Sequence, residues 1–140
     1  NAYVMGEHGD SQFVAWSYAL CGVQPIYQIA SRKDSKIKFE DLENIEDEVR
    51  NIAYKIIECK KSTYYGIGMA LTLENENSVL TVSSYLNGEY GHDDVYIAVP
   101  SIVNEDGVRE VIHLPLDIEE KEKLDKSIEI MKENINKLDI

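Results

Sequence analysis

The connections between three strand-like segments in the second half of the chain are too short to contain a helix. These segments are Val79–Tyr85, Tyr96–Val99 and Val111–Leu114. Parallel strands need a crossover of a dozen or more residues, whereas short turns join antiparallel strands. Asp106–Gly107, which lies between the last two segments, is typical of a hairpin turn. We therefore expect a three-stranded antiparallel meander.

Two long segments carry apolar residues at helical spacing. In residues 39–61 the apolar stripe consists of Leu42, Ile45, Val49, Ile52 and Ile56. In the C-terminal segment it consists of Leu124, Ile128, Met131, Ile135 and Leu138, which we expect to face inward. Residues three and four apart share one face, so both segments are predicted to be long amphipathic helices. Asp117 and Glu120 have capping-box spacing, and Ser62–Thr63 could cap a further helix over Tyr64–Leu73.

The N-terminal part is expected to be extended. Ala2–Met5 is short and apolar, as a buried strand would be, and the polar loop Gly6–Ser11 follows it. Phe13–Ile29 alternates in polarity and is interrupted by Gly22 and Pro25, which favours extended structure over one long helix. The predicted fold class is α+β, with antiparallel strands packed against long amphipathic helices.

Composition limits the partners of the chain. Its 140 residues suit one domain, and the formal net charge of −12 argues against nucleic acid and anionic membranes as partners. Apolar runs are shorter than the roughly 20 residues of a membrane span. We expect Cys21 and Cys59 to be reduced core residues of a cytoplasmic protein rather than a disulfide or a metal pair.

His8 is the residue best placed for chemistry. It lies between Glu7 and Gly9 in a loop that follows a predicted strand, and such loops often carry functional sites. Histidine titrates near neutral pH and can pass a proton in either direction. On these grounds alone, an ordinary surface or structural histidine is the alternative.

The other candidate side chains have plainer interpretations. His92 lies beside two aspartates, but its surroundings lack metal-ligand spacing, and no metal site is predicted. His113 alternates with apolar residues, so we expect it on the exposed face of a strand. Tyr64, Tyr65 and Trp16 are interpreted as core or subunit contacts.

Two segments carry a family resemblance. Gly6–Ser11, with Tyr3–Met5 before it and Val14–Ser17 after it, resembles the active-site histidine segment of L-lactate dehydrogenases. Lys61–Ala70 resembles the start of the substrate-pocket helix in bacterial members. The order of elements and the separation of these segments also match the C-terminal domain of the lactate/malate dehydrogenase group. The resemblance covers essentially the whole chain.

The resemblance implies a chemistry. Members of this family transfer a hydride between C2 of a 2-hydroxy acid and the nicotinamide of NAD. By position, His8 would take the hydroxyl proton during oxidation and return it to the ketone oxygen during reduction. Thr63 matches the threonine that helps to hold the substrate. Ile67 matches a residue that lines the nicotinamide side, although a simple core isoleucine is an equal interpretation.

The resemblance also implies missing parts. Residues 1–140 correspond to a single catalytic and substrate-binding domain, and the Rossmann domain that binds NAD lies upstream in the family. The chain lacks a G-x-G-x-x-G turn. The family's two substrate arginines and the aspartate that orients the histidine also lie upstream, and Asp10 is expected only to shape its loop. The chain begins at Asn1 inside a predicted strand, so we expect an excised fragment with negligible activity alone.

The resemblance also has implications for regulation and assembly. Many bacterial members carry a histidine at the position of Asn1, where it helps to bind fructose 1,6-bisphosphate at a subunit interface. Asparagine supplies no positive charge, which argues against this activation. The family forms homotetramers, so a homo-oligomer is expected.

The leading hypothesis is the catalytic half of a cytoplasmic, NAD-dependent L-lactate dehydrogenase, interconverting pyruvate and L-lactate in glycolysis or fermentation. One alternative keeps the chemistry but takes a bulkier substrate, such as L-2-hydroxyisocaproate. Another class of hypothesis is an association module without chemistry. An in-frame Rossmann sequence upstream of Asn1 would favour the enzyme over the module.

Overall fold

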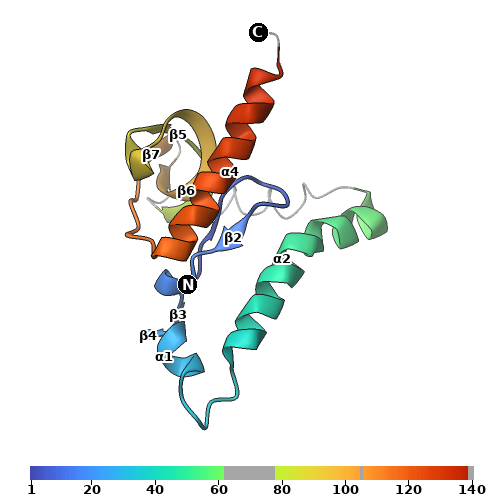
Figure 1. Cartoon of the computed structure of the whole chain (residues 1–140), viewed down its shortest axis with the longest axis vertical. Coiled ribbons are helices and arrows are strands. Elements are labelled where there is room, and N and C mark those ends of the chain that lie inside the picture. Colours follow the sequence, from blue (N-terminus) through green and yellow to red (C-terminus); the bar gives the residue numbers. More distant parts are fainter. Residues whose placement is uncertain (62–77, 105, 139–140) are drawn as a thin grey trace.

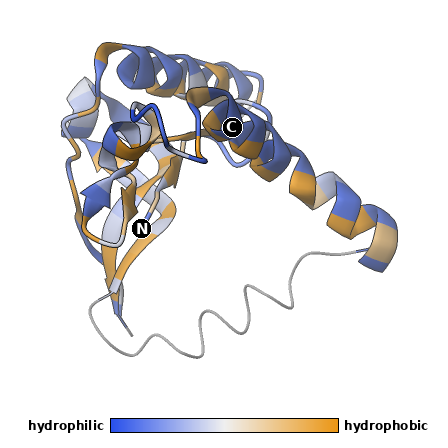
Figure 2. Cartoon of the chain, turned by 90° about the horizontal axis from the view of Figure 1, so that it is seen from below, coloured by the Kyte–Doolittle hydropathy of each residue, from blue (hydrophilic) through white to orange (hydrophobic). Residues whose placement is uncertain are grey.

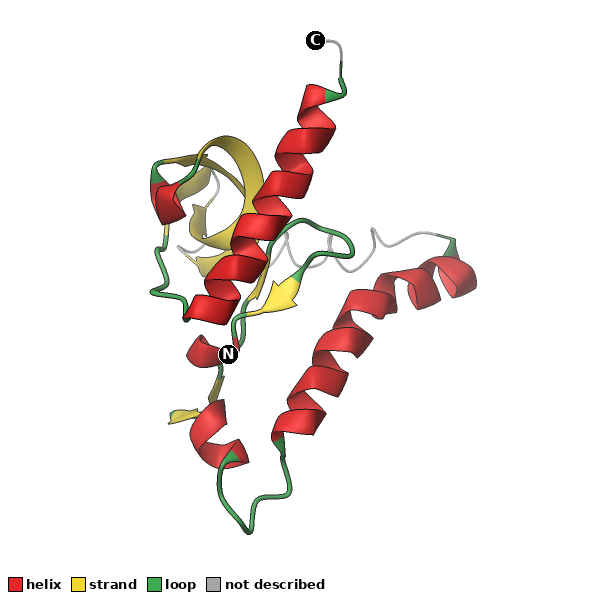
Figure 3. Ribbon diagram, viewed as in Figure 1, coloured by secondary structure: helices red, strands yellow, loops and turns green. Residues whose placement is uncertain are grey.

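The computed structural model of the chain describes residues 1–61, 78–104 and 106–138 (Figure 1). The strands are β1 (Val4–Met5), β2 (Phe13–Val14), β3 (Leu20–Cys21), β4 (Gln24–Pro25), β5 (Ser78–Asn87), β6 (Asp93–Asn104) and β7 (Gly107–Val111). The α-helices are α1 (Ile26–Ala30), α2 (Phe39–Lys60) and α4 (Ile118–Asn136), and the 3-10 turns are η1 (Trp16–Tyr18) and η2 (Glu89–Gly91). Figure 3 colours these helices red, the strands yellow and the described loops and turns green. The α+β prediction is confirmed.

The largest sheet is the predicted meander. Its strand order is β5-β6-β7, and both pairings are antiparallel. The third strand was predicted at Val111–Leu114, and this position is wrong because β7 runs from Gly107 to Val111 and shares only Val111 with the prediction. Asn104 pairs with Gly107, so β6 and β7 are already paired at the two residues that flank the turn. The ladder has ended by Leu114, whose backbone N–H donates to the hydroxyl of Tyr90 instead.

Helix α4 lies across this sheet and closes the main core (Figure 1). Leu124 and Ile128 are buried against the cluster that contains Met5 and Phe13. Asp117 and Glu120 form the predicted capping box. The inward stripe is correct as far as Met131, which is partly buried and packs against the main core. Ile135, near the end of α4, and Leu138, which follows the helix, are exposed because this end projects beyond the sheet.

Helix α2 begins and ends close to its predicted limits. Lys61 follows it in the left-handed conformation, with φ of 63°, and so ends the helix. Near the start of α2, Leu42 is buried in a second cluster with Ala19 and Ile26. Figure 2 shows apolar bands along the whole helix, yet Ile52 is exposed. The packing of α2 on the rest of the described chain is therefore limited to part of its apolar surface.

The segment Phe13–Ile29 is only partly extended. It contains the short strands β2, β3 and β4, as predicted, but Trp16–Tyr18 forms a 3-10 turn and Ile26–Ala30 forms a helix. Pro25 precedes that helix with φ of −58°, which suits a helix start. Short helical segments therefore replace an extended chain here. The helix predicted over 64–73 lies outside the described residues.

Two other sequence predictions need correction. Cys21 and Cys59 are free but exposed, so they are not core residues. Cys21 lies on a two-stranded ribbon, and Cys59 lies near the end of α2, where the described residues give the helix little to pack against. His113 is exposed, but it follows β7 rather than lying within a strand, and its ring stacks on Tyr90 with centroids 4.5 Å apart.

In the described part of the chain, no helix combines the length and apolar character of a membrane span.

Candidate functional site

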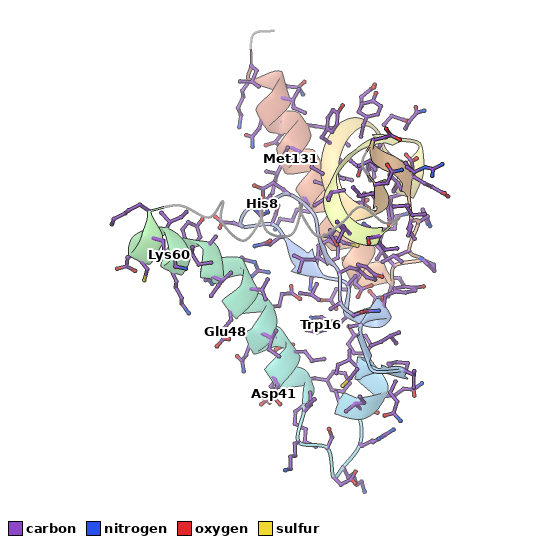
Figure 4. All side chains as sticks on the ribbon, turned by 180° about the vertical axis from the view of Figure 1, so that it is seen from behind. His8, Trp16, Asp41, Glu48, Lys60 and Met131 are labelled. Carbon is purple, nitrogen blue, oxygen red and sulfur yellow. The ribbon has the colours of Figure 1, made fainter. Side chains whose placement is uncertain are left out.

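His8 lies in the loop between β1 and β2, and it is exposed (Figure 4). Both ends of this loop are fixed, since Met5 pairs with Phe13 at the start of the hairpin. Gly6 also exchanges two backbone hydrogen bonds with Ala98 of β6, at 3.0 and 3.1 Å. The main sheet and the small β1–β2 sheet thus hold the backbone that leads into His8.

Side chains inside the loop add a second set of contacts. The hydroxyl of Ser11 donates to Glu7 Oε2 at 2.7 Å. Ser127, which comes from α4, accepts a hydrogen bond from the backbone N–H of Glu7 and lies 2.9 Å from the hydroxyl of Ser11. The residue before His8 is therefore bonded through both its backbone and its carboxylate.

Asp10 connects the loop to α2. Its Oδ1 accepts a hydrogen bond from the hydroxyl of Tyr54 at 3.0 Å. This hydrogen bond, together with the negative charge of Asp10, raises the pKa of the Tyr54 phenol. The contact agrees with the expectation that Asp10 shapes the loop, and Asp10 makes it to α2 rather than to the ring of His8.

A small cavity lies at His8. Its volume is about 310 Å³. Its lining residues are Val4, Met5, Gly6, Glu7, His8, Gln12, Val49, Ile52, Ala53, Thr81 and Ala98. The lining is mainly aliphatic and includes a small number of polar side chains, as in binding sites for small molecules. The size suits a small organic acid better than a whole dinucleotide.

A second and more polar cavity is also lined by residues of this loop. It has a volume of about 560 Å³ and includes Gln12, Arg50, Lys123 and Lys126. Glu46 neutralises much of this charge, because it pairs with Arg50 at 3.3 Å and with Lys123 at 3.6 Å. Of these two cavities, the smaller one contains His8.

Other sequence candidates have different outcomes. Thr63 and Ile67 lie outside the described residues, so their placement beside His8 stays a prediction. His92 Nε2 lies 2.6 Å from Asp125 Oδ1 and links the start of β6 to α4. Among the residues that the structure describes, no group of three or more acidic, histidine or cysteine side chains could hold a metal ion. Trp16 packs beside the second cluster, as predicted for a core contact.

Ser127 and Tyr54 contact the loop and were not singled out from the sequence. Tyr54 offered no signal, since it lies among exposed residues of α2. Ser127 offered a weak one. It lies three residues after Leu124 and four before Met131, so it is a small polar residue within an apolar stripe.

Comparison with known proteins identifies the family. The sequence model described as lactate/malate dehydrogenase, alpha/beta C-terminal domain, matches residues 1–139. The chain belongs to the lactate/malate dehydrogenase family. This confirms the resemblance that the histidine segment and the Lys61–Ala70 segment indicated.

Among lactate dehydrogenase relatives, "L-lactate dehydrogenase 2" of Bacillus anthracis is 48% identical over 96% of this chain. The "L-lactate dehydrogenase" of Bacillus pumilus is 49% identical over 95% of it. The chain covers 45% and 44% of these proteins, respectively. It therefore spans about half the length of the curated relatives that it matches.

Solved structures of the family have the same fold. The minor L-lactate dehydrogenase from Enterococcus mundtii, in its ligands-bound form, is 44% identical with a TM-score of 0.89, over 100% of this chain and 46% of that one. The malate dehydrogenase from Aeropyrum pernix is 31% identical with a TM-score of 0.82, over 99% of this chain and 46% of that one. The C-terminal domain fold is thus shared by lactate and malate enzymes.

Proposed function

We propose that this chain is the substrate-binding and proton-transferring half of a cytoplasmic, NAD-dependent L-lactate dehydrogenase, which interconverts pyruvate and L-lactate. The observation that carries the proposal is the exposed His8 on a firmly held loop beside a small, mainly aliphatic cavity. Relatives named L-lactate dehydrogenase, at 48 to 49% identity, support the choice of substrate.

His8 is the proposed acid and base. During reduction, the protonated imidazole donates a hydrogen bond to the ketone oxygen of the 2-oxo acid, and its proton passes to that oxygen as the hydride reaches C2. During oxidation, the neutral imidazole accepts the hydroxyl proton as the hydride leaves C2. Histidine suits both directions because its ordinary pKa lies close to neutral pH.

NAD, when bound, would accept or supply the hydride. The cavity of about 310 Å³ at His8 fits the reacting carbon and its small substituents rather than the whole dinucleotide. We propose that a Rossmann domain, together with the substrate arginines, supplies the remaining contacts in the whole protein. Residues 1–140 would then be one catalytic domain with negligible turnover alone.

Three further assignments belong to this proposal. Thr63 would help to hold the substrate, and Ile67 would line the nicotinamide side of the site. The whole protein would be a homotetramer. The exposed Ile45 and Ile52, seven residues apart on one face of α2, support burial of this face against other parts of the whole protein.

A substrate comparison tests the proposed function. The whole protein would be assayed by NADH oxidation with pyruvate, with the branched 2-oxoisocaproate and with oxaloacetate. The proposal predicts the highest kcat/KM for pyruvate. A preference for 2-oxoisocaproate would support the 2-hydroxyisocaproate alternative, and a preference for oxaloacetate would assign the chain to the malate branch.

The same assay addresses the association module. Absence of NADH oxidation with all three acids, in a folded whole protein, would support a module without chemistry. Residues 1–140 alone serve as the companion sample, for which we expect no pyruvate-dependent NADH oxidation. Turnover by that sample would contradict the need for a second domain.

A further inference from the structure

Ser127 is buried completely beneath the loop that carries His8. It lies on α4, and its exposed fraction is 0%. Its hydroxyl oxygen contacts two groups of the loop, the backbone N–H of Glu7 and the hydroxyl of Ser11. A helix from the other end of the chain thus reaches the backbone immediately before His8.

Proton counting fixes the direction of each hydrogen bond. The hydroxyl of Ser11 has one proton, which it donates to Glu7 Oε2 at 2.7 Å. The contact of 2.9 Å between the two serine hydroxyls must therefore take its proton from Ser127. Ser127 donates to Ser11, Ser11 donates to Glu7, and the N–H of Glu7 donates back to Ser127. This closed ring of hydrogen bonds uses every hydroxyl proton.

Gly6 shows how closely α4 approaches the loop. Its φ is 101°, and a Cβ added there would lie 2.9 Å from Ser127 Oγ. Only a residue without a side chain leaves room for this contact. On its other side, Gly6 pairs with Ala98. The two residues before His8 are therefore held between β6 and Ser127.

His8 itself is bound less tightly than its predecessors. In the ranges 1–61, 78–104 and 106–138, its ring has no hydrogen-bond partner, and its residue is exposed. Among the described residues, the contacts of the preceding backbone fix the position of His8, and the family resemblance places the aspartate that orients its ring upstream. A small shift of a catalytic group costs a large factor in rate, because reaction requires close alignment.

We propose that Ser127 is a positioning residue for His8. By holding the N–H of Glu7 and the hydroxyl of Ser11, it sets the direction in which the His8 ring leaves the loop. This inference rests on the proposed role of His8 in proton transfer. The hydrogen bonds of Ser127 to the loop can also be tested directly, by hydrogen exchange.

Ser127→Ala removes the hydroxyl and leaves the packing nearly unchanged. Ser84→Ala is the matched control, because Ser84 is also a buried serine, and it bonds the hydroxyl of Ser101 within the sheet at 2.8 Å. In the whole protein, Ser127→Ala should lower kcat about tenfold or more while KM for the 2-oxo acid changes by less than about twofold. Ser84→Ala should leave both constants within about twofold.

Hydrogen exchange in the 140-residue chain provides the second measurement. Ser127→Ala should speed exchange of the Glu7 amide, which donates to Ser127, about tenfold or more relative to amides of β5 and β6. Ser84→Ala should leave the Glu7 amide unchanged. If Ser127→Ala does not fold, Ser127→Cys is used, since its thiol is a weaker partner of similar shape.

The two proposals can fail separately. If exchange in the loop is faster in the Ser127 variant and His8→Gln keeps full turnover, Ser127 holds the loop but His8 does not transfer the proton. Loss of turnover in His8→Gln, with wild-type kcat and wild-type exchange in the Ser127 variant, would overturn the positioning role. Equal effects of the Ser127 and Ser84 substitutions on kcat would overturn it as well, because general destabilisation would explain both.

Discussion

The indole Nε1–H of Trp16 donates a hydrogen bond to Glu46 Oε2 at 3.0 Å, and this bond joins η1 to α2. The other carboxylate oxygen of Glu46 pairs with Arg50 from α2 and Lys123 from α4. Glu46 is buried, and its charge is paired with a hydrogen-bonded Arg50 and with the ammonium of Lys123. One carboxylate thus connects the helix that flanks the His8 cavity to the helix that carries Ser127.

Glu46→Ala should lower the free energy of unfolding by about 1–3 kcal/mol, because it leaves the Trp16 donor and two cations without their shared acceptor. The control is Glu48→Ala, an exposed glutamate on the same helix, which should change stability by less than about 0.5 kcal/mol. Urea unfolding followed by the fluorescence of the single tryptophan measures both. Equal midpoints for the two variants would contradict a structural role for this carboxylate.

Glu120→Ala should destabilise the chain more than Asp117→Ala. Both substitutions break the capping box of α4, which is worth about 1 kcal/mol. Glu120 also accepts hydrogen bonds from the backbone N–H and the hydroxyl of Ser17, and it is buried. We expect an additional loss of about 1–2 kcal/mol for Glu120→Ala in urea unfolding. The reverse order would show that the Ser17 contacts contribute little.

Gly6→Ala should be more destabilising than Gly22→Ala. Both glycines have positive φ, but a Cβ at Gly6 would lie 2.9 Å from Ser127 Oγ, whereas a Cβ at Gly22 has no atom of the described residues within 4 Å. The backbone conformation alone costs about 1–2 kcal/mol in each variant. We expect about 1 kcal/mol or more in addition for Gly6→Ala, measured by thermal or urea unfolding. Similar losses would mean that α4 can move away from the loop without cost.

Tyr27 should make stability depend on pH in the alkaline range. Burial, reinforced by the carboxylates of Glu120 and Asp117, raises the pKa of Tyr27 to about 12. The unfolded chain releases this proton near pH 10, so the free energy of unfolding falls as pH rises from about 10 to about 12. Tyr27→Phe should show a shallower decline in urea unfolding over this range. The other tyrosines titrate in both proteins, so identical slopes would contradict the raised pKa.

Local patterns predicted the parts of the fold that local interactions determine. The capping box at Asp117 and the buried Leu124 and Ile128 follow from helix spacing alone. The position of β7 was mispredicted, and only Val111 of the predicted strand lies in it. The hairpin sets the register, whereas the apolar pattern continues past Val111. Tertiary packing also decided that Ile135 is exposed, since α4 extends beyond the sheet that it covers.

The candidate site shows the same division. His8 could be singled out because its loop, its neighbours and the family resemblance are all visible in the sequence. The contacts of its loop could not be predicted from the sequence, because Ser127 lies 116 positions from Ser11, and Tyr54 lies 44 positions from Asp10. Such pairs depend on how the helices pack, and this packing has no signature at either residue alone.

His8→Gln in the whole protein tests the central claim most directly. Glutamine keeps a polar side chain of similar size but cannot carry a proton near neutral pH. We predict that kcat for pyruvate reduction falls by about 10²–10⁴-fold, while NADH affinity stays within about twofold. His113→Gln, at an exposed histidine outside the loop, should retain wild-type turnover. If His8→Gln also retained kcat within a factor of a few, His8 would not be the proton donor, and the account given for this loop would be wrong.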